Sequence, residues 1–171
     1  MFPCERVDLT FVDPDSRKAP FLFRNSVDLS VTPEQLFDVL ADPDSWPRWA
    51  PVITKVTWTS PEPRRVGTTR TVEMRGGMVG NEEFLAWEPS TRMAFRFNEC
   101  STQAVAAFAE DYRVEVIPGG CRLTWIMAQK PAGPAWLAMY LFRPLLNLGL
   151  RRFLRRLRSY TASRYAPTGQ R

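Results

Sequence analysis

The feature that most constrains the fold is a change in hydrophobic period near residue 134 of this 171-residue chain. Between Pro51 and Pro134, short segments rich in β-branched and aromatic residues alternate with turn signals, a pattern typical of strands. No helical segment separates them, so an antiparallel meander is expected rather than a parallel sheet. From Pro134 to about Ala162, apolar residues recur three to four positions apart, which predicts one long helix kinked at Pro144.

The segment before the meander adds one strand and two short helices to the prediction. "FLFRNSVDLS" has strand-like composition, and Thr32, Pro33 and Gln35 then supply an N-cap, a first-turn proline and a capping-box glutamine. "DPDSWPRWAP" follows as a short second helix or turn. Residues 1–20 read as an N-terminal extension, and residues 163–171 as a flexible tail. The whole pattern predicts an α+β fold in a single domain.

The chain contains no histidine, which excludes serine triads, cysteine–histidine dyads and histidine-ligated zinc. Acid–base chemistry would therefore depend on Asp, Glu, Tyr, Lys or a perturbed thiol. Cys4, Cys100 and Cys121 form no C-x-x-C pair, and their odd number is a poor basis for a disulfide framework. No secretory signal and no apolar run long enough to span a bilayer are evident. We therefore expect a cytoplasmic protein without a metal or a cofactor.

Several segments at the joints of this pattern resemble a known superfamily. They are "VDLSVTPEQLFDVLADPDSWPRWAP", "WEPSTRMAFRF", "YRVEVIPGGCRLTW" and Val66-Gly67. On these segments the chain resembles the polyketide cyclase/dehydrase-like families of the START and birch-pollen-allergen superfamily over residues 21–162. The resemblance implies the helix-grip fold, in which a curved antiparallel sheet of about seven strands grips a long C-terminal helix around a cavity for an apolar or aromatic molecule. Members include lipid carriers, hormone receptors and aromatase/cyclases, so the fold leaves the function open.

Three polar residues on otherwise apolar strand faces are candidates for chemistry in such a cavity. If its strand alternates regularly, Glu110 lies between Phe108 and Tyr112, where a raised pKa would suit an acid–base group. Alternatively, a bulge or the end of the sheet places Glu110 in water. Arg70 shares a face with apolar residues and could hold a ligand oxyanion, or it could guard a sheet edge. Tyr112 could bind ligand or make a structural hydrogen bond.

The expected lining of the cavity is aromatic and apolar. Trp46 and Trp49 lie on the short second helix, which covers one end of the cavity in the resembling families, and they act there as gate residues or as core. The other candidate ligand-binding residues come from three strands and the long helix: Phe95, Phe97, Phe108, Trp125, Met139 and Phe142.

Charge is distributed unevenly along the chain. After Glu115 there is no acidic residue but there are ten Lys and Arg residues. A basic helix with apolar residues opposite is typical of contact with an anionic membrane, here through Arg151, Arg152, Arg155, Arg156 and Arg158. The alternative is a solvated face whose arginines pair with acids of the sheet. Nucleic-acid binding is not expected, because no aromatic stacking platform accompanies the arginines.

Three functions remain open at this point. The first is a protein that binds a hydrophobic small molecule such as a lipid, a quinone or a polyketide-like aromatic. The second is an aromatase/cyclase, a lyase-like enzyme for cyclisation and dehydration of a polyketide, with Glu110 as acid–base, Tyr112 as acid and Arg70 as oxyanion stabiliser. The third is an interaction protein that forms a homodimer through residues 135–148.

Overall fold

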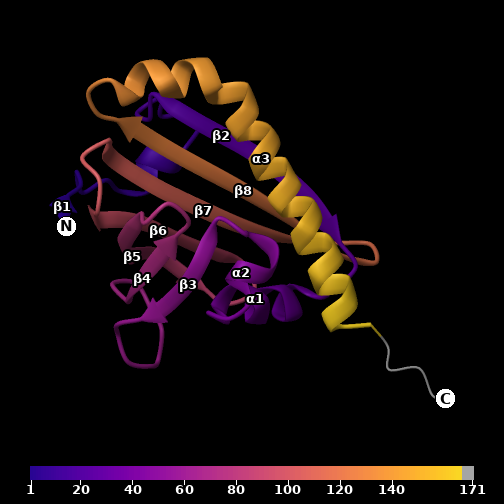
Figure 1. Cartoon of the computed structure of the whole chain (residues 1–171). Helices are drawn as coiled ribbons and strands as arrows, with labels where there is room; N and C mark the ends of the chain where they lie inside the picture. The colour runs from indigo at the N-terminus through magenta and orange to yellow at the C-terminus, as the bar shows by residue number, and fades with distance from the viewer. Residues whose placement is uncertain (167–171) are drawn as a thin grey trace.

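The structure is a computed structural model that describes residues 1–166 (Figure 1). Its strands are β1 (Phe2–Pro3), β2 (Phe21–Leu29), β3 (Ile53–Trp58), β4 (Thr69–Met74), β5 (Val79–Glu88), β6 (Arg92–Cys100), β7 (Val105–Ile117) and β8 (Gly120–Pro131). Its helices are the 3-10 helix η1 (Leu9–Val12) and the α-helices α1 (Pro33–Ala41), α2 (Trp46–Trp49) and α3 (Ala135–Arg164).

The strands form one antiparallel sheet in the order β2-β8-β7-β6-β5-β4-β3. Strands β3 to β7 each pair with the next strand along the chain, while β2 forms the other edge of the sheet beside β8. Figure 1 shows the sheet curving, with α3 crossing one face and α1 and α2 grouped at one end. The predicted meander, the seven-stranded sheet and the two short helices after the first long strand are confirmed.

The start of α1 follows from its capping residues. The Thr32 hydroxyl accepts a hydrogen bond from the Gln35 amide at 3.3 Å, and the Gln35 side-chain oxygen accepts one from the Thr32 amide at 3.0 Å. This reciprocal box satisfies two amides that a helix start leaves without intrahelical partners. The apolar residues that follow, Leu36 and Leu40 among them, are fully buried. The predicted helix start is therefore confirmed.

Helix α3 is continuous from Ala135 to Arg164 and contains Pro144, near which Figure 1 shows it bending. Proline removes a helical hydrogen bond and clashes with the preceding turn, which explains the bend. After the bend, Leu150, Leu154 and Leu157 are buried against the sheet. Of the predicted tail, residues 163–164 belong to α3, and residues 167–171 lie outside the described part of the chain. Within residues 1–166, no helix is both long and apolar enough to cross a bilayer.

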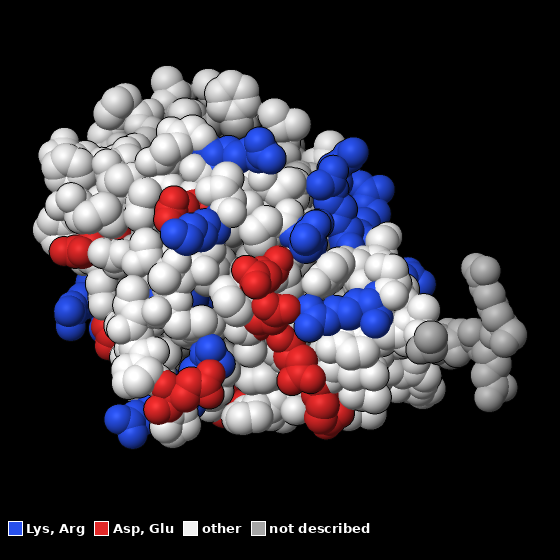
Figure 2. Space-filling view, turned by 60° about the horizontal axis from the view of Figure 1, so that its bottom comes forward, with Lys and Arg blue, Asp and Glu red and all other residues white. Residues whose placement is uncertain are grey.

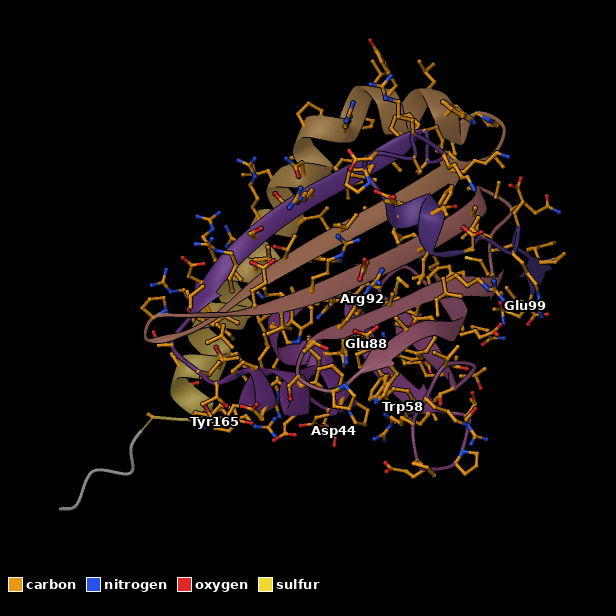
Figure 3. The ribbon with its side chains drawn as sticks, turned by 180° about the vertical axis from the view of Figure 1, so that it is seen from behind. Asp44, Trp58, Glu88, Arg92, Glu99 and Tyr165 are labelled. Carbon is orange, nitrogen blue, oxygen red and sulfur yellow. The ribbon has the colours of Figure 1, made fainter. Side chains whose placement is uncertain are left out.

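The N-terminal extension packs on the face of the sheet opposite α3. In η1, Phe11 and Val12 are buried against Ala109 and Ile126 of β7 and β8, and Figure 3 shows η1 over these strands from behind. Alanines on this face leave room for the two larger side chains. β1 also pairs with the end of β6, where β7 has diverged. The face of the sheet that carries α3 is therefore left free of the N-terminal extension.

Candidate functional site

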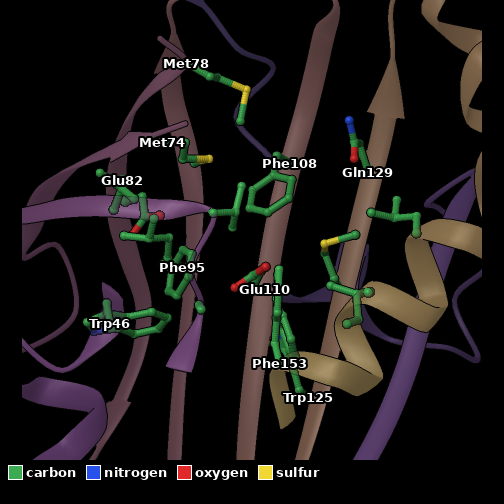
Figure 4. Close-up of a pocket in the computed structure, with 18 of the residues that line it drawn as sticks. Trp46, Met74, Met78, Glu82, Phe95, Phe108, Glu110, Trp125, Gln129 and Phe153 are labelled. Carbon is green, nitrogen blue, oxygen red and sulfur yellow. The ribbon is translucent and has the colours of Figure 1, made fainter. Parts of the chain in front are cut away.

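A cavity of about 500 Å³ lies between the sheet and α3. Its walls come from α2, from strands β3 to β8 and from α3, so segments distant in sequence meet around it (Figure 4). The aromatic residues in its lining are Trp46, Trp49, Phe95, Phe97, Phe108, Tyr112, Trp125, Phe142 and Phe153. Such a lining suits a flat or elongated apolar molecule, which would gain affinity mainly from burial.

Strand register explains why these side chains converge. Phe95, Glu110 and Met127 occupy opposing positions on β6, β7 and β8, so their side chains leave the sheet on the same face. Tyr112 and Trp125 are likewise opposite each other. Figure 4 shows Glu110 projecting into the cavity with Phe95 and Phe108 on one side and Trp125 on the other.

Glu110 and Tyr112 form a buried hydrogen-bonded pair. The Tyr112 hydroxyl donates to Oε2 of Glu110 at 2.5 Å, and both side chains are buried. Burial raises the pKa of Glu110 to about 8, although the hydrogen bond from Tyr112 acts in the opposite direction. Burial, together with the neighbouring Glu110, also raises the pKa of Tyr112 well above its usual value. At neutral pH Glu110 is therefore mostly a neutral acid that can donate a proton or a hydrogen bond.

Arg70 and Glu82 form a second buried pair in the same wall. Nε of Arg70 donates to Oε2 of Glu82, and Arg70 is only 1% exposed. The guanidinium carbon lies 4.5 Å from the ring centroid of Trp46 and 4.6 Å from that of Phe95. Burial raises the pKa of Glu82, while the charge and hydrogen bond of Arg70 lower it. Rings and carboxylate together replace the water that a guanidinium loses on burial.

Three hydrogen-bond donors in the cavity wall have no partner. They are Nη1 of Arg70 and the indole Nε1 atoms of Trp49 and Trp125, and within residues 1–166 they are the buried side-chain polar atoms left unpaired. All three residues line the cavity. A buried donor without a partner costs about 1–3 kcal/mol. None of the three atoms is exposed to the cavity space, so the acceptor atoms of a ligand would reach them only after a shift of these side chains.

The mouth of the cavity is marked by lining residues that are also exposed. Val52 follows α2, and Phe142 and Leu145 lie on the first half of α3. Their exposed fractions are 37%, 60% and 64%. The rim of the cavity mouth is therefore apolar, which suits the entry of an apolar ligand better than that of a small polar one.

The structure brings together most of the predicted site residues. Glu110, Tyr112 and Arg70 all line the cavity, as do Trp46, Trp49, Phe95, Phe97, Phe108, Trp125 and Phe142. Met139 does not belong to the lining and packs at the side of the main core instead.

Two alternatives considered from the sequence are wrong. Glu110 is 7% exposed, because β7 keeps its register with β8 through this region and no bulge turns the side chain into water. Arg70 does not guard a sheet edge, since β4 lies inside β3 and the side chain points inward to Glu82.

Several lining residues were missed by the sequence analysis. The most important is Glu82, which alternates with half-buried neighbours on β5 and shares its face with the buried Phe84 and Ala86. The same period of two that pointed to Glu110 would have identified it. Gln129 likewise continues the face of β8 that carries Trp125 and Met127.

A curved antiparallel sheet that grips a long C-terminal helix around an apolar cavity defines the helix-grip class of α+β domains. Within this class, the chain belongs to the family described as "Polyketide cyclase / dehydrase and lipid transport", which matches residues 20–162. An uncharacterized protein of Mycobacterium tuberculosis (strain H37Rv) and one of Mycobacterium bovis are each 72% identical to it over 170 residues, which is 99% of both chains.

Solved structures share the fold at low sequence identity. A START superfamily protein from Mycobacterium smegmatis matches with a TM-score of 0.69 at 10% identity, over 83% of this chain and 97% of that one. The Zhui aromatase/cyclase from Streptomyces sp. R1128 matches with a TM-score of 0.68 at 14% identity, over 88% of this chain and 99% of that one. At these identities the likeness concerns the fold alone.

Proposed function

We propose that the protein binds a mainly apolar, oxygen-bearing small molecule, such as a quinone or a polyketide-like aromatic, in the cavity beneath α3. The observation that carries this proposal is a cavity of mainly aromatic walls that also contains the carboxyl of Glu110, with three unpaired donors of Trp49, Arg70 and Trp125 just beneath its surface. Neutral Glu110 adds a fourth donor. Aromatic walls favour a flat ligand, and the donors favour ligand carbonyl or hydroxyl oxygens over a plain hydrocarbon chain.

Calorimetric titration with two matched probes tests this proposal. Menadione, a naphthoquinone, and the corresponding methylnaphthalene hydrocarbon share one ring skeleton and differ in two carbonyl oxygens. We expect menadione to bind at least about tenfold more tightly, because each satisfied buried donor contributes on the order of 1 kcal/mol. Equal affinity for the two probes would contradict the polar recognition.

A cavity-blocking variant provides the control for location. Gly149 lines the cavity from α3, and a Cβ placed there meets no atom within 4 Å. Gly149→Phe should therefore fill the cavity and abolish binding without disturbing the backbone. Ala138→Phe, at an exposed position of the same helix outside the lining, should bind menadione as the parent protein does. Unchanged binding by Gly149→Phe would place the ligand elsewhere.

A second candidate function is cyclisation and dehydration of a polyketide. The specific observation in its favour is that burial brings the pKa of Glu110 to about 8, close to the pH at which a group can both remove and return a proton. Ionised Glu110 would take a proton from the carbon between two ketones. The resulting carbanion would attack a further carbonyl carbon, and the alkoxide formed would take this proton back from Glu110 to become a hydroxyl. Glu110 would then remove the remaining hydrogen of the attacking carbon and pass it to the departing hydroxyl, so that water leaves and a carbon–carbon double bond forms. Arg70, whose side chain lines the cavity, would stabilise the enolate oxygen through its positive charge.

Turnover measurements on conservative variants test the enzymatic proposal. With a synthetic poly-β-ketone thioester as substrate, Glu110→Gln should lower kcat by about 10²–10⁴, the usual contribution of a general acid–base group. Tyr112→Phe, which removes the hydroxyl bonded to Glu110, should shift the pH profile of the remaining activity. An unchanged rate in Glu110→Gln, with folding verified by circular dichroism, would reject this role.

A further inference from the structure

The first half of α3 exposes an unusual amount of apolar surface. Of the twelve large hydrophobic side chains exposed within residues 1–166, seven belong to this stretch, with exposed fractions between 44% and 73%. We call these seven the apolar segment: Trp136, Leu137, Tyr140, Leu141, Phe142, Leu145 and Leu148. Contiguous apolar surface of this kind marks an interaction site rather than an ordinary solvated surface.

The second half of the same helix is cationic, and among its arginines Arg158 shares a surface groove with Asp28 and Glu115. No Asp or Glu occurs in α3, and its only ion pair within residues 1–166 joins Arg164 to Asp42. The other arginines of this half make no ion pair in the described chain: Arg151, Arg152, Arg155, Arg156 and Arg158. Arg24 of β2 adds to this charge, because it shares a surface groove with Arg151 and Arg155. Figure 2 shows basic side chains gathered on the side of the molecule where α3 runs.

The pairing of these two surfaces points to a specific partner. We propose that the apolar segment inserts into the interfacial layer of an anionic membrane while the arginines after Gly149 contact the lipid headgroups. Apolar and basic residues both contribute to the free energy of binding. Apolar side chains stabilise the bound state by leaving water, and each arginine contributes about 1 kcal/mol near an anionic leaflet. Apolar and basic residues are separated along α3 rather than on opposite faces, so the helix meets the membrane with its first half.

A second copy of the chain is a poorer occupant of this surface. Each copy carries a formal net charge of +5, and α3 offers no carboxylate to the arginines of a partner. Dimerisation through α3 would therefore bury apolar surface but leave the arginines uncompensated. An anionic bilayer satisfies both halves of the helix at once.

The mouth of the cavity lies within the apolar segment of α3. Phe142 and Leu145 belong both to the apolar segment and to the cavity lining. A docked α3 would therefore place the mouth against the acyl boundary of the bilayer. An apolar ligand could then pass between membrane and cavity without crossing water, which would otherwise oppose the transfer of its apolar surface.

Vesicle flotation of the full chain, without added ligand, tests the charge requirement. We expect binding to vesicles made of equal parts phosphatidylcholine and phosphatidylglycerol, and little binding to phosphatidylcholine alone. Arg152→Gln/Arg155→Gln/Arg156→Gln should weaken binding about 100-fold, from about 1 kcal/mol per arginine. The matched control Arg6→Gln/Lys18→Gln/Arg65→Gln removes three exposed charges elsewhere and should bind nearly as the parent does.

The apolar requirement is tested in the same assay. Leu137 and Leu141 are 65% and 61% exposed and do not line the cavity. Leu137→Gln/Leu141→Gln should weaken vesicle binding at least about tenfold, because a buried leucine contributes about 1.5–3 kcal/mol. Val66→Gln/Val116→Gln, at exposed positions of 61% and 79%, is the matched control and should leave binding unchanged.

Three results would overturn the proposal. The first is no flotation of the parent protein with the anionic vesicles. The second is equal loss of binding in the arginine variant and in its charge control. The third is a dimer in sedimentation equilibrium that Leu137→Gln/Leu141→Gln dissociates while vesicle binding stays absent, since a second copy would then occupy the surface. None of these depends on the ligand of the cavity, so the proposed function can fail or succeed separately.

Discussion

Replacing Glu82 with glutamine is expected to lower the free energy of unfolding by about 3–5 kcal/mol. Glu82 supplies the carboxylate for the guanidinium of Arg70, which is 1% exposed and has an unpaired Nη1 already. Replacing that carboxylate with a neutral amide would leave a buried positive charge without a counter-charge. Urea unfolding followed by circular dichroism measures the loss.

A double variant separates the cost of the unpaired charge from the loss of the pair itself. Arg70→Met/Glu82→Leu removes both charges and fills the space with apolar side chains, so its stability should equal or exceed that of the parent. If Glu82→Gln cost less than about 1 kcal/mol, or if the double variant were as unstable as Glu82→Gln, the ion pair would not have the role assigned to it. Glu83→Gln, on the neighbouring and more exposed position of β5, is the control.

The stability of the parent protein is expected to fall as the pH rises from about 5 to about 8. In the folded state Glu110 holds its proton up to a pKa of about 8, whereas an unperturbed glutamate releases it near 4.5. The folded state therefore binds more protons in this interval, and each pH unit removes up to about 1.4 kcal/mol. Urea unfolding at a series of pH values measures the slope.

Glu110→Gln should flatten this slope and be more stable than the parent at the alkaline end, because the amide cannot ionise in the apolar wall. No imidazole titrates in the same window, because the chain contains no histidine. The pKa of Glu82 is also raised by burial, so part of the slope should remain in Glu110→Gln. Glu83 serves again as control: its pKa lies below the usual value, so Glu83→Gln should retain the parent slope. A parent protein with no slope between about pH 5 and pH 8 would contradict the buried neutral state of Glu110.

Burying Arg70, Glu82 and Glu110 lowers the stability of the fold compared with apolar side chains at the same positions. Leucine or phenylalanine at positions 70, 82 and 110 would fill the same wall without unpaired donors or shifted pKa values. Local rules of core composition are usually broken where a protein binds or reacts. The cost of this cluster thus supports a role in ligand recognition, in line with the proposed function.

Much of the fold followed from sequence because its signals are periodic. The period of two on β7 placed Glu110 and Tyr112 on one face, and the period of 3.6 after Pro134 predicted α3 nearly to its end. The Thr32 capping box predicted the start of α1. Each of these signals lies within one element, so no knowledge of tertiary packing was needed.

Features that depend on contacts between distant segments were not predictable. The pairing of Arg70 with Glu82 requires β4 and β5 to be in the register that places these two residues opposite each other. The docking of Phe11 and Val12 depends on small residues of β7 and β8 far along the chain. Met139 was assigned to the cavity from helical spacing alone, but the bend near Pro144 changes which residues of α3 face it.

The tryptophans of this chain divide into groups with different surroundings, which has a practical consequence. Trp46, Trp49 and Trp125 line the cavity within one aromatic cluster. The ring centroid of Trp49 lies 4.9 Å from that of Trp46 and 6.2 Å from that of Trp125. Trp136 lies outside this cluster, at the exposed start of α3, where its ring is 5.2 Å from that of Phe21. Variants that keep only one group would therefore turn intrinsic fluorescence into two separate optical reporters, one for occupancy of the cavity and one for the transfer of α3 out of water.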